Sequence, residues 1–315
     1  MLYFIVNETS RSGKARQIWK DIQQSLIKAD VPYEYMVTQG KNHATRLASE
    51  ISQKPEDDIC IVVIGGDGTM NEVINGIVDF DKVRFGIIPT GSGNDFGGGL
   101  GLPKSPKENL QQIISSYKAG VDSYKPMDIG VVRWGHGKKK LLGISSGIGL
   151  DAIVCKKALT SKLKKVLNKL GLGSLTYVLL TIITLFSMRT ADFEISYDNN
   201  KRTLKKTIFA AAMNLRAEGG GVPMAPDANP YDGKLSISSA SGIPKGITFL
   251  CLPFLVAGKH THIRGFNLVS CKEATIHASQ KMTLHADGEY VADVTDLTFG
   301  VYPQKLRLMN ESHLK

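Results

Sequence analysis

The sequence is poor in cysteine and in aromatic residues, and each shortage excludes a class of protein. The chain has 315 residues and four scattered cysteines, with no Cys-x-x-Cys pair among them. This spacing predicts reduced thiols in a cytosolic protein and excludes a disulfide framework or a cysteine-rich zinc site. Aromatic residues make up 7% of the chain and are not interleaved with the basic residues. Because stacking sites for nucleic acids need such interleaved aromatics, we expect no nucleic-acid partner.

Signals for secretion or membrane insertion are also scarce. The first apolar run covers only Leu2 to Val6 and has no basic segment before it, so it is too short for a secretory signal. One longer stretch, Leu170 to Met188, contains no charged residue and has the length of a membrane-spanning helix, which needs about 20 residues. Its glycines, serine and threonines dilute its apolar character. We therefore favour a buried or membrane-facing helix there over a spanning one.

Positive charge is abundant. Lysine and arginine number 39 against 29 acidic residues, a formal net charge of +10, which favours anionic partners. Six lysines precede the charge-free stretch, and they predict a patch that faces anionic lipid headgroups at about 1 kcal/mol per lysine. A solvated helix face is the alternative. The six are Lys156, Lys157, Lys162, Lys164, Lys165 and Lys169.

The order of the predicted elements divides the chain into two domains. The composition, 42% hydrophobic and 22% charged, is ordinary for a globular protein. Residues 1–126 alternate strand and helix patterns, which predicts a parallel α/β sheet. Residues 127–301 show the patterns of short strands, among them 127–133, 273–277 and 281–285, with a helical insertion at 153–188. These patterns predict a mainly antiparallel β domain. We assign the last segment, 302–315, to the first domain.

Three polar, glycine-containing loops follow predicted strands of the first domain. Gly65–Thr69 (GGDGT) lies between a buried strand and a helix, and Thr90–Asp95 and Asn7–Lys14 follow two other strands. Glycines let the backbone approach a phosphate closely, with the amides at a helix N-terminus aimed at it. Parallel sheets bind ligands at the carboxyl ends of their strands. The loops therefore predict one shared nucleotide site, with Asp67 facing Mg²⁺ or acting as a base.

Other motifs can be tested against the sequence. The phosphate-binding pattern GxxxxGK[ST] fails because Ala15 follows Lys14. A dinucleotide pattern, GxGxxA, matches Gly147–Ala152, but no acidic residue closes a following strand, so we reject a dinucleotide site there. In the second domain, Asp232 precedes a glycine and either forms a turn or binds a hard cation with loop carbonyls. Glu289 follows a second Asp-Gly turn and on the local sequence is a plain surface carboxylate.

Taken together, these motifs resemble a known family. GGDGTMNEVINGI at 65–77 and GIIPTGSGNDF at 86–96 are similar to the catalytic domain of diacylglycerol kinases, and most of all to soluble bacterial lipid kinases related to sphingosine and ceramide kinases. NAD kinases share GGDGT but lack the GSGNDF block and the ADGE sequence. The resemblance covers nearly the whole chain: Asn7–Gly13, Thr38, His43 and Ala44, Asp128–Gly130, Ser146–Ala152, Asn214, Gly219–Gly221, Asp232, Gly233 and Asp287–Glu289.

The resemblance implies an N-terminal nucleotide-binding α/β domain (1–126 with 302–315), a C-terminal β-rich lipid-substrate domain (127–301), and ATP in the cleft between them. It implies Mg²⁺ held with ATP by Asp67, Asp95 and Asp128, and a structural Mg²⁺ on Asp232 with backbone oxygens near Asn229 and Lys234. The implied ATP-binding residues are Asn7, Ser12, Gly13, Lys14, Thr38, Gly66, Asp67, Gly68, Thr69, Asn71, Glu72 and Ser92.

The same resemblance gives two candidates for the catalytic base. Glu289 would accept the proton of the lipid hydroxyl, and Asp67 is the rival because relatives acting on sphingoid lipids are assigned that aspartate. The chain departs from the family at Glu8, where a proline is usual, and at Ser92, where the family often has threonine. Ser92 keeps the hydroxyl, so these changes affect the loop contacts rather than the activity.

The sequence therefore predicts an ATP-dependent lipid kinase, with diacylglycerol converted to phosphatidic acid as the leading reaction. Phosphoryl transfer needs mainly positioning and charge stabilisation, which glycine loops, a cation network and one base supply. Alternatives are another lipid (a sphingoid base or phosphatidylglycerol), a soluble acceptor such as a dinucleotide, and a nucleotide-binding protein without catalysis. We expect a cytoplasmic protein at the inner face of an anionic membrane. A homodimer stays open.

Overall fold

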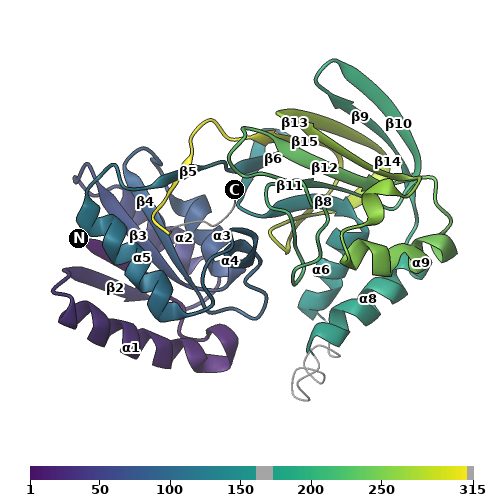
Figure 1. Ribbon diagram of the computed structural model, residues 1–315. Coiled ribbons are helices and arrows are strands. Elements are labelled where there is room, and N and C mark those ends of the chain that lie inside the picture. The colour runs from purple at the N-terminus through teal and green to yellow at the C-terminus, as the bar shows by residue number, and fades with distance from the viewer. Residues whose placement is uncertain (161–172, 311–315) are drawn as a thin grey trace. The chain divides into compact units, whose positions relative to one another are not determined.

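The computed structural model describes residues 1–160 and 173–310, and the chain divides into two compact units (Figure 1). Unit 1 consists of Met1–Ile129 and Tyr302–Lys315, and unit 2 consists of Gly130–Val301. Four lysines of the expected basic patch lie outside the described residues: Lys162, Lys164, Lys165 and Lys169.

Unit 1 is built on a mostly parallel sheet of six strands. The first four strands in the chain are parallel, and the end of the chain returns to add a strand that is parallel to β4 and antiparallel to β5. The spatial order is β2 (Tyr33–Val37), β1 (Leu2–Val6), β3 (Ile59–Gly65), β4 (Val83–Pro89), β16 (Leu306–Leu308) and β5 (Lys125–Met127).

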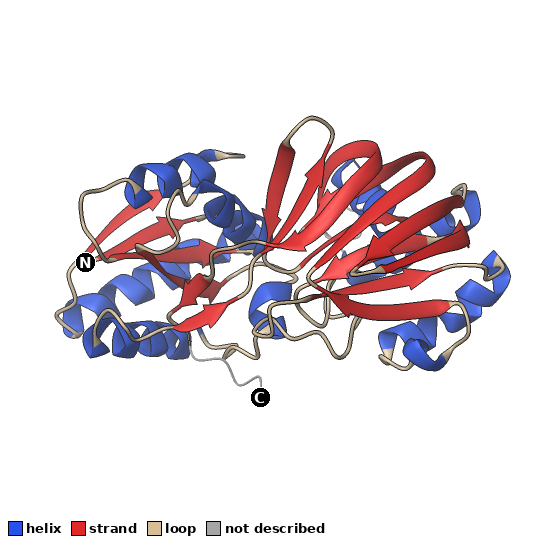
Figure 2. Ribbon diagram, turned by 90° about the horizontal axis from the view of Figure 1, so that it is seen from above, coloured by secondary structure: helices blue, strands red, loops and turns tan. Residues whose placement is uncertain are grey.

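Helices lie on both faces of this sheet (Figure 2), so its central strands are buried along almost their whole length, as parallel strands usually are. In α1, Trp19, Ile22 and Leu26 recur at helical spacing and pack on the core. The helix α5 starts with Ser105, whose hydroxyl accepts the Glu108 amide, and with a proline in its first turn. The helices are η1 (Ser10–Gly13), α1 (Lys14–Lys28), α2 (His43–Ser52), α3 (Asp67–Gly76), α4 (Asp95–Gly99) and α5 (Pro106–Ala119).

Unit 2 is built on an antiparallel sheet of ten strands. Its longest strands, β14 and β15, form a hairpin, and β14 also pairs with β8 and β9. The main path runs β13 (Phe266–Cys271), β12 (Leu235–Ala240), β11 (Phe209–Met213), β8 (Ser145–Gly149), β14 (Glu273–Ala286), β15 (Glu289–Val301), β6 (Gly130–Trp134) and β7 (Lys138–Leu142). Off this path, β9 (Ala191–Tyr197) pairs with β14, and β10 (Asn200–Thr207) pairs with β9.

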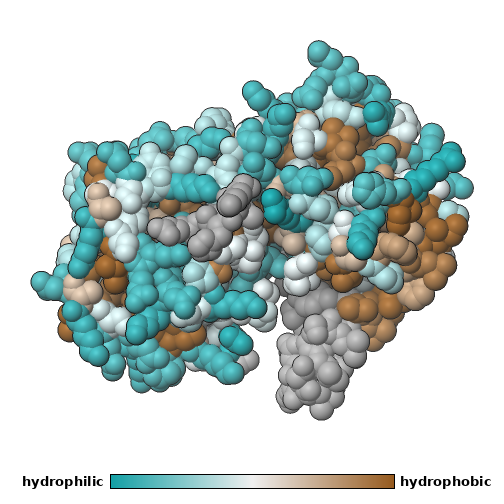
Figure 3. Space-filling model, viewed as in Figure 1, coloured by the Kyte–Doolittle hydropathy of each residue, from teal (hydrophilic) through white to brown (hydrophobic). Residues whose placement is uncertain are grey.

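In the described part of unit 2 the helices are α6 (Leu150–Thr160), α8 (Gly173–Ser187), α9 (Lys245–Val256) and the short η2 (His260–His262). Leu185 of α8 and Cys251 of α9 join one core cluster with Met213 of the sheet. The outer sides of α8 and α9 are apolar and exposed, and they form a brown surface in Figure 3. The exposed large apolar residues there are Val178, Leu179, Ile183, Phe186, Ile247, Phe249, Leu250, Phe254 and Val256.

The fold class predicted from the sequence is confirmed, with local corrections. The segments expected as two strands, 273–277 and 281–285, form the single strand β14, whose pairing register shifts between His277 and Met282. The strand expected at 127–133 is divided into β5 and β6, which belong to different units. The structure also contains β10, β13 and α9, which were not predicted. Within the described residues, no helix is long and apolar enough to cross a membrane.

A largely buried ion pair connects two central strands of unit 1 with the end of a helix. Arg84 in β4 is 1% exposed, and its guanidinium donates to both carboxylate oxygens of Asp58, at 2.8 and 2.6 Å. Another guanidinium nitrogen donates to the carbonyls of Ser116 and Gly120 at the end of α5. The pair therefore joins the start of β3, the middle of the sheet and the last turn of α5.

Removing one partner of this pair should destabilise unit 1. We expect Asp58→Asn to lower the free energy of unfolding by about 2 kcal/mol, below the ~3–5 kcal/mol typical of fully buried pairs, because the Asp58 side chain is 23% exposed. Urea unfolding measured by circular dichroism checks this. The matched control is Asp57→Asn, an exposed neighbour, and an equal loss in the two variants would contradict the assigned role.

Candidate functional site

The GGDGT loop turns directly from β3 into α3. Gly65 ends the strand, Gly66 is extended (φ −96°, ψ −176°), and the helix begins at Asp67. A Cβ at Gly65 would lie 2.7 Å from the Cβ of Thr69. A Cβ at Gly91, in the second glycine loop, would lie 2.7 Å from the Cα of Gly66. The backbones of the two loops are thus in contact, and side chains at these positions would force them apart.

The loop after β1 joins the same edge of the sheet. The Asn7 side-chain amide donates to the Thr69 hydroxyl at 2.9 Å, and the Ser10 hydroxyl donates to the Thr90 carbonyl at 3.0 Å. The Thr90 amide in turn donates to the Gly65 carbonyl at 2.8 Å. All three loops singled out in the sequence therefore meet at the carboxyl ends of β1, β3 and β4.

Asp67 links the first glycine loop to α4. Its two carboxylate oxygens accept the amides of Asp95 and Phe96, each at 3.1 Å. A Cβ at Gly93 would lie 3.3 Å from Asp67 Oδ2 and 3.6 Å from Asp95 Oδ2, so these two carboxylates flank one point of the loop. Paired carboxylate oxygens are the ligands that Mg²⁺ takes in sites for nucleoside phosphates.

The other expected ATP-binding residues differ in their hydrogen bonds and in how far they are buried. The Glu72 carboxylate accepts the amides of Asn42 and Ala44 and so caps the N-terminus of α2. Thr38, directly after β2, donates its amide to the Val6 carbonyl. Of the remaining residues, Lys14, Gly13 and Ser92 are exposed, Gly66 and Gly68 are half-buried, Thr69 and Asn71 are buried, and the Ser12 side chain lies outside the described part of the chain.

Asp128 is paired inside unit 1. It is 0% exposed and forms an ion pair with Lys305, whose side chain is 41% exposed. Lys305 directly precedes β16, so the returning end of the chain supplies the charge that balances this buried carboxylate. A cation at Asp128 would therefore share it with this ammonium group.

The Asp232 loop connects β11 to β12. Asp232 Oδ1 accepts the Lys234 amide at 3.0 Å, and Asn229 Oδ1 accepts the Tyr231 amide at 3.2 Å, so each side chain forms a local turn. Asn229, Asp232 and Lys234 are all exposed. A carboxylate, an amide oxygen and loop carbonyls are ligand types that fit a hard cation.

Glu289 stands at the start of β15, just after a tight turn. Asp287 and Gly288 both have positive φ (46° and 78°), as a two-residue type I′ hairpin requires. The Asp287 carboxylate accepts the amides of Gly143, Ile144 and Ser145, each at 2.9 Å. These bonds fix the turn to the loop before β8, and with it the position of the half-buried Glu289.

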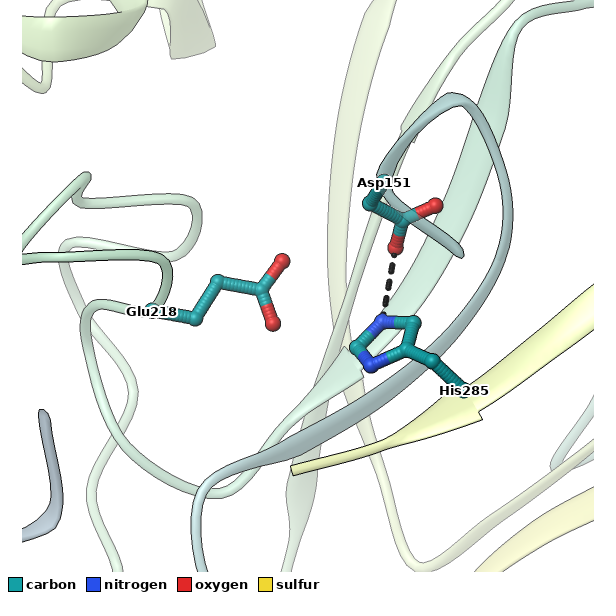
Figure 4. A group of neighbouring side chains, drawn as sticks. All are labelled: Asp151, Glu218 and His285. Atoms are coloured by element: carbon teal, nitrogen blue, oxygen red, sulfur yellow. Dashed lines mark hydrogen bonds and ion pairs between the residues drawn. The ribbon is translucent and has the colours of Figure 1, made fainter. Parts of the chain in front are cut away.

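Beside this turn lies a cluster of three ionisable side chains, Asp151, Glu218 and His285 (Figure 4). His285 Nε2 lies 3.0 Å from Asp151 Oδ2. A Cβ at Gly147 would fall 2.1 Å from that same oxygen, so only glycine leaves room for the pair. Burial lowers the pKa of His285, but the Asp151 carboxylate, aided by Glu218 and Asp287, outweighs it and raises the pKa to about 9.

The pairing register separates this cluster from Glu289. In the hairpin His285 is opposite Tyr290 and Ala286 is opposite Glu289. Paired residues share a face of the sheet and adjacent ones alternate, so His285 and Glu289 lie on opposite faces. The sequence alone predicted no function for this cluster. The GxGxxA match at Gly147–Ala152 was the local sequence pattern that pointed to this region, because it contains both Gly147 and Asp151.

Two family models match the chain. The model described as the diacylglycerol kinase catalytic domain matches residues 1–125. The model described as the YegS C-terminal NAD kinase beta sandwich-like domain matches residues 144–310.

Individual relatives and solved structures agree with these matches. The chain is 32% identical to "Putative lipid kinase YtlR" of Bacillus subtilis (strain 168), covering 97% of this chain and 98% of that one. It is 28% identical to a diacylglycerol kinase of the same organism over 91% of this chain and 88% of the relative. A crystal structure described as a putative diacylglycerol kinase from Bacillus anthracis str. Sterne shares the fold, with a TM-score of 0.75 at 23% identity over 99% and 98% of the chains.

A more distant structure, an NAD kinase from Archaeoglobus fulgidus in complex with ATP, has a TM-score of 0.58 at 12% identity, covering 99% of this chain and 94% of that one. It shows a common fold and nothing finer. The two family models and the 32% identical relative span almost the whole chain. The chain therefore belongs to the diacylglycerol kinase-like family of lipid kinases.

Proposed function

We propose that this protein transfers the γ-phosphoryl group of ATP to the hydroxyl of a lipid, with diacylglycerol as the leading acceptor and phosphatidic acid as the product. The observation that carries this proposal is that three loops suited to binding phosphate meet at one edge of the unit 1 sheet. Membership of a lipid kinase family and an apolar surface on unit 2 support the acceptor class.

The loops supply the parts that phosphoryl transfer needs. The amides of Gly66 and Gly68 lie where β3 turns into α3, a position that favours anionic oxygens. Lys14 is exposed at the start of α1 and can reach a phosphate as a point charge. Asp67 and Asp95 would hold Mg²⁺, which neutralises charge on the phosphate oxygens when bound. We assign Asp128 to the same network and Asn229, Asp232 and Lys234 to a structural Mg²⁺ site in unit 2.

We assign the base to Glu289 rather than to Asp67. Both Asp67 oxygens already accept backbone amides, and these bonds hold its carboxylate against α4. Glu289 is half-buried, and its turn is fixed by the three bonds to Asp287. In the reaction Glu289 takes the hydroxyl proton, the hydroxyl oxygen bonds to the γ-phosphorus, and the bond to the leaving ADP breaks.

An apolar surface on unit 2 favours a membrane-resident acceptor over a soluble one. On α8 and α9, which contact each other through Phe186 and Phe249 (ring centroids 6.0 Å apart), large apolar side chains face the solvent. Leu250, for example, is 67% exposed. Contiguous patches of this kind mark protein or membrane contacts. We propose that the apolar side chains of α8 and α9 bind the inner leaflet of an anionic membrane from the cytoplasm. The proposed membrane contact thus includes α9 in addition to the insertion at 153–188.

The two described lysines of the expected basic patch have partners within unit 2. Lys156 forms an ion pair with Asp293 at 3.0 Å, and Lys157 donates to the Thr184 hydroxyl at 3.1 Å. Lys245, at the start of α9, donates to the Phe186 carbonyl at 3.1 Å. The apolar surface rather than Lys156 and Lys157 therefore carries this part of the proposal.

The activity is tested with labelled ATP, Mg²⁺ and a panel of acceptors in anionic micelles. The panel holds diacylglycerol, monoacylglycerol, sphingosine, ceramide and phosphatidylglycerol, with NAD as the soluble acceptor. We expect label on diacylglycerol, and a rate about 10²–10⁴-fold lower for Glu289→Gln, the usual effect of losing a general base.

The matched control is Glu273→Gln at the far end of the same hairpin, where the carboxylate is exposed and lies 3.5 Å from Arg133. This variant should keep the full rate. Label on NAD alone would refute the lipid acceptor, and a full rate in Glu289→Gln together with loss in Asp67→Asn would move the base to Asp67.

Membrane binding is tested by sedimentation with phosphatidylglycerol vesicles. Replacing Leu250 and Phe254 with glutamate should weaken binding at least about ten-fold, since burying each side chain contributes roughly 1.5–3 kcal/mol. Ile27→Glu in α1 is the control, because Ile27 is equally exposed (69%) but belongs to unit 1. Unchanged vesicle binding in the double variant, or a dimer in solution that the double variant dissociates, would show that the surface serves another partner.

A further inference from the structure

We propose that Asp151, Glu218 and His285 of unit 2 form a binding site for a divalent transition-metal ion such as Zn²⁺ or Mn²⁺. The site lies outside the phosphate loops of unit 1 and outside the Asp232 loop, and it does not depend on the proposed kinase activity. The three residues come from the start of α6, the loop after β11 and the end of β14 (Figure 4).

The spacing of the ligand atoms suits one ion. One nitrogen of His285 and one oxygen from each carboxylate all lie within 4.8 Å of one another. His285 Nε2 and Asp151 Oδ2 are 3.0 Å apart, close to the separation of neighbouring ligands around an ion with bonds of about 2.0–2.2 Å. The Glu218 carboxylate points toward this pair (Figure 4).

The charge of the cluster also calls for a cation. Two carboxylates face one imidazole, which carries at most one positive charge. The side chains of His285 and Asp151 are 2% and 11% exposed, and Asp151 Oδ1 is buried without a hydrogen-bond partner. A buried ionised carboxylate is costly unless a partner balances it. The neighbouring Asp287 carboxylate is already balanced by three backbone amides, and a divalent ion would balance Asp151.

The surroundings are built for this close approach. Gly147 leaves the space in which Asp151 and His285 meet. The Ser145 hydroxyl donates to the Glu218 carboxylate, and bonds of this kind orient metal ligands. Glu218 directly precedes Gly219–Gly221, three exposed glycines at which an added Cβ would contact nothing.

The donor set selects the class of ion. Mg²⁺ and Ca²⁺ prefer sites made only of oxygen ligands, whereas an imidazole nitrogen with carboxylates suits Zn²⁺, Mn²⁺ or Co²⁺. A bound ion would connect α6, β14 and the Glu218 loop, three segments that are far apart in the sequence. Its role is therefore to hold the glycine loop against the sheet.

The test is Zn²⁺ titration of the full, untagged, chelator-treated chain by calorimetry, with Co²⁺ absorption as the spectroscopic readout. We expect one equivalent of Zn²⁺, and an affinity that rises between pH 6 and pH 8 because the ion and protons compete for His285. Glu218→Gln and His285→Gln should each weaken binding at least roughly ten-fold. Circular dichroism without metal confirms that both variants fold, and Glu218, on a surface loop, is the safer substitution.

The matched control is His277→Gln, because His277 also contacts a carboxylate (Asp296, 2.6 Å) but is exposed. It should bind Zn²⁺ as the unaltered chain does. Absence of Zn²⁺ binding, unchanged binding in Glu218→Gln, or an equal loss in His277→Gln would each overturn the proposed site. Kinase assays do not enter the test, so its outcome is independent of the proposed reaction.

Discussion

The contact between the backbones at Gly66 and Gly91 is the constraint on which the rest of unit 1 depends. The register of β3 and β4 sets Gly65 opposite Pro89, so the two loops leave the sheet side by side and must pass each other without side chains. Once they do, Asn7 reaches Thr69, Ser10 reaches Thr90 and Asp67 reaches α4. The polar edge of the sheet thus depends on two positions that leave little or no room for a side chain.

Carboxylates that accept backbone amides recur throughout the molecule. Asp67 fixes α4, Glu72 caps α2, and Asp287 fixes the hairpin turn before Glu289. In each case an acidic side chain satisfies amides that a helix end or turn leaves unpaired. The acidic residues of the glycine-rich motifs therefore position the loops as well as offering charge.

The sequence predicted the elements whose patterns are local and strong. Buried strands such as CIVVI and the helix that carries Trp19, Ile22 and Leu26 are periodic within a few residues. The sequence did not predict α9, because that helix is apolar on all sides and contains Pro253. It also did not predict β10, because this exposed, lysine-rich edge strand lacks the alternation of apolar and polar residues. The Asp151–His285–Glu218 cluster could not be foreseen, because its members come together only when β8 pairs with β11 and β14. Asp151 and His285 are 134 positions apart in the sequence.

The return of the chain to unit 1 has a consequence for its synthesis. β16 completes the sheet between β4 and β5, Lys305 balances the buried Asp128, and the Asn310 side chain bonds the backbone of Ile87 in β4. A nascent chain that has passed residue 129 still lacks these partners, and they emerge from the ribosome only after all of unit 2. Unit 2 is continuous in sequence and can fold before residues 302–310 are synthesised. The sheet of unit 1 can be completed only after those residues have been made.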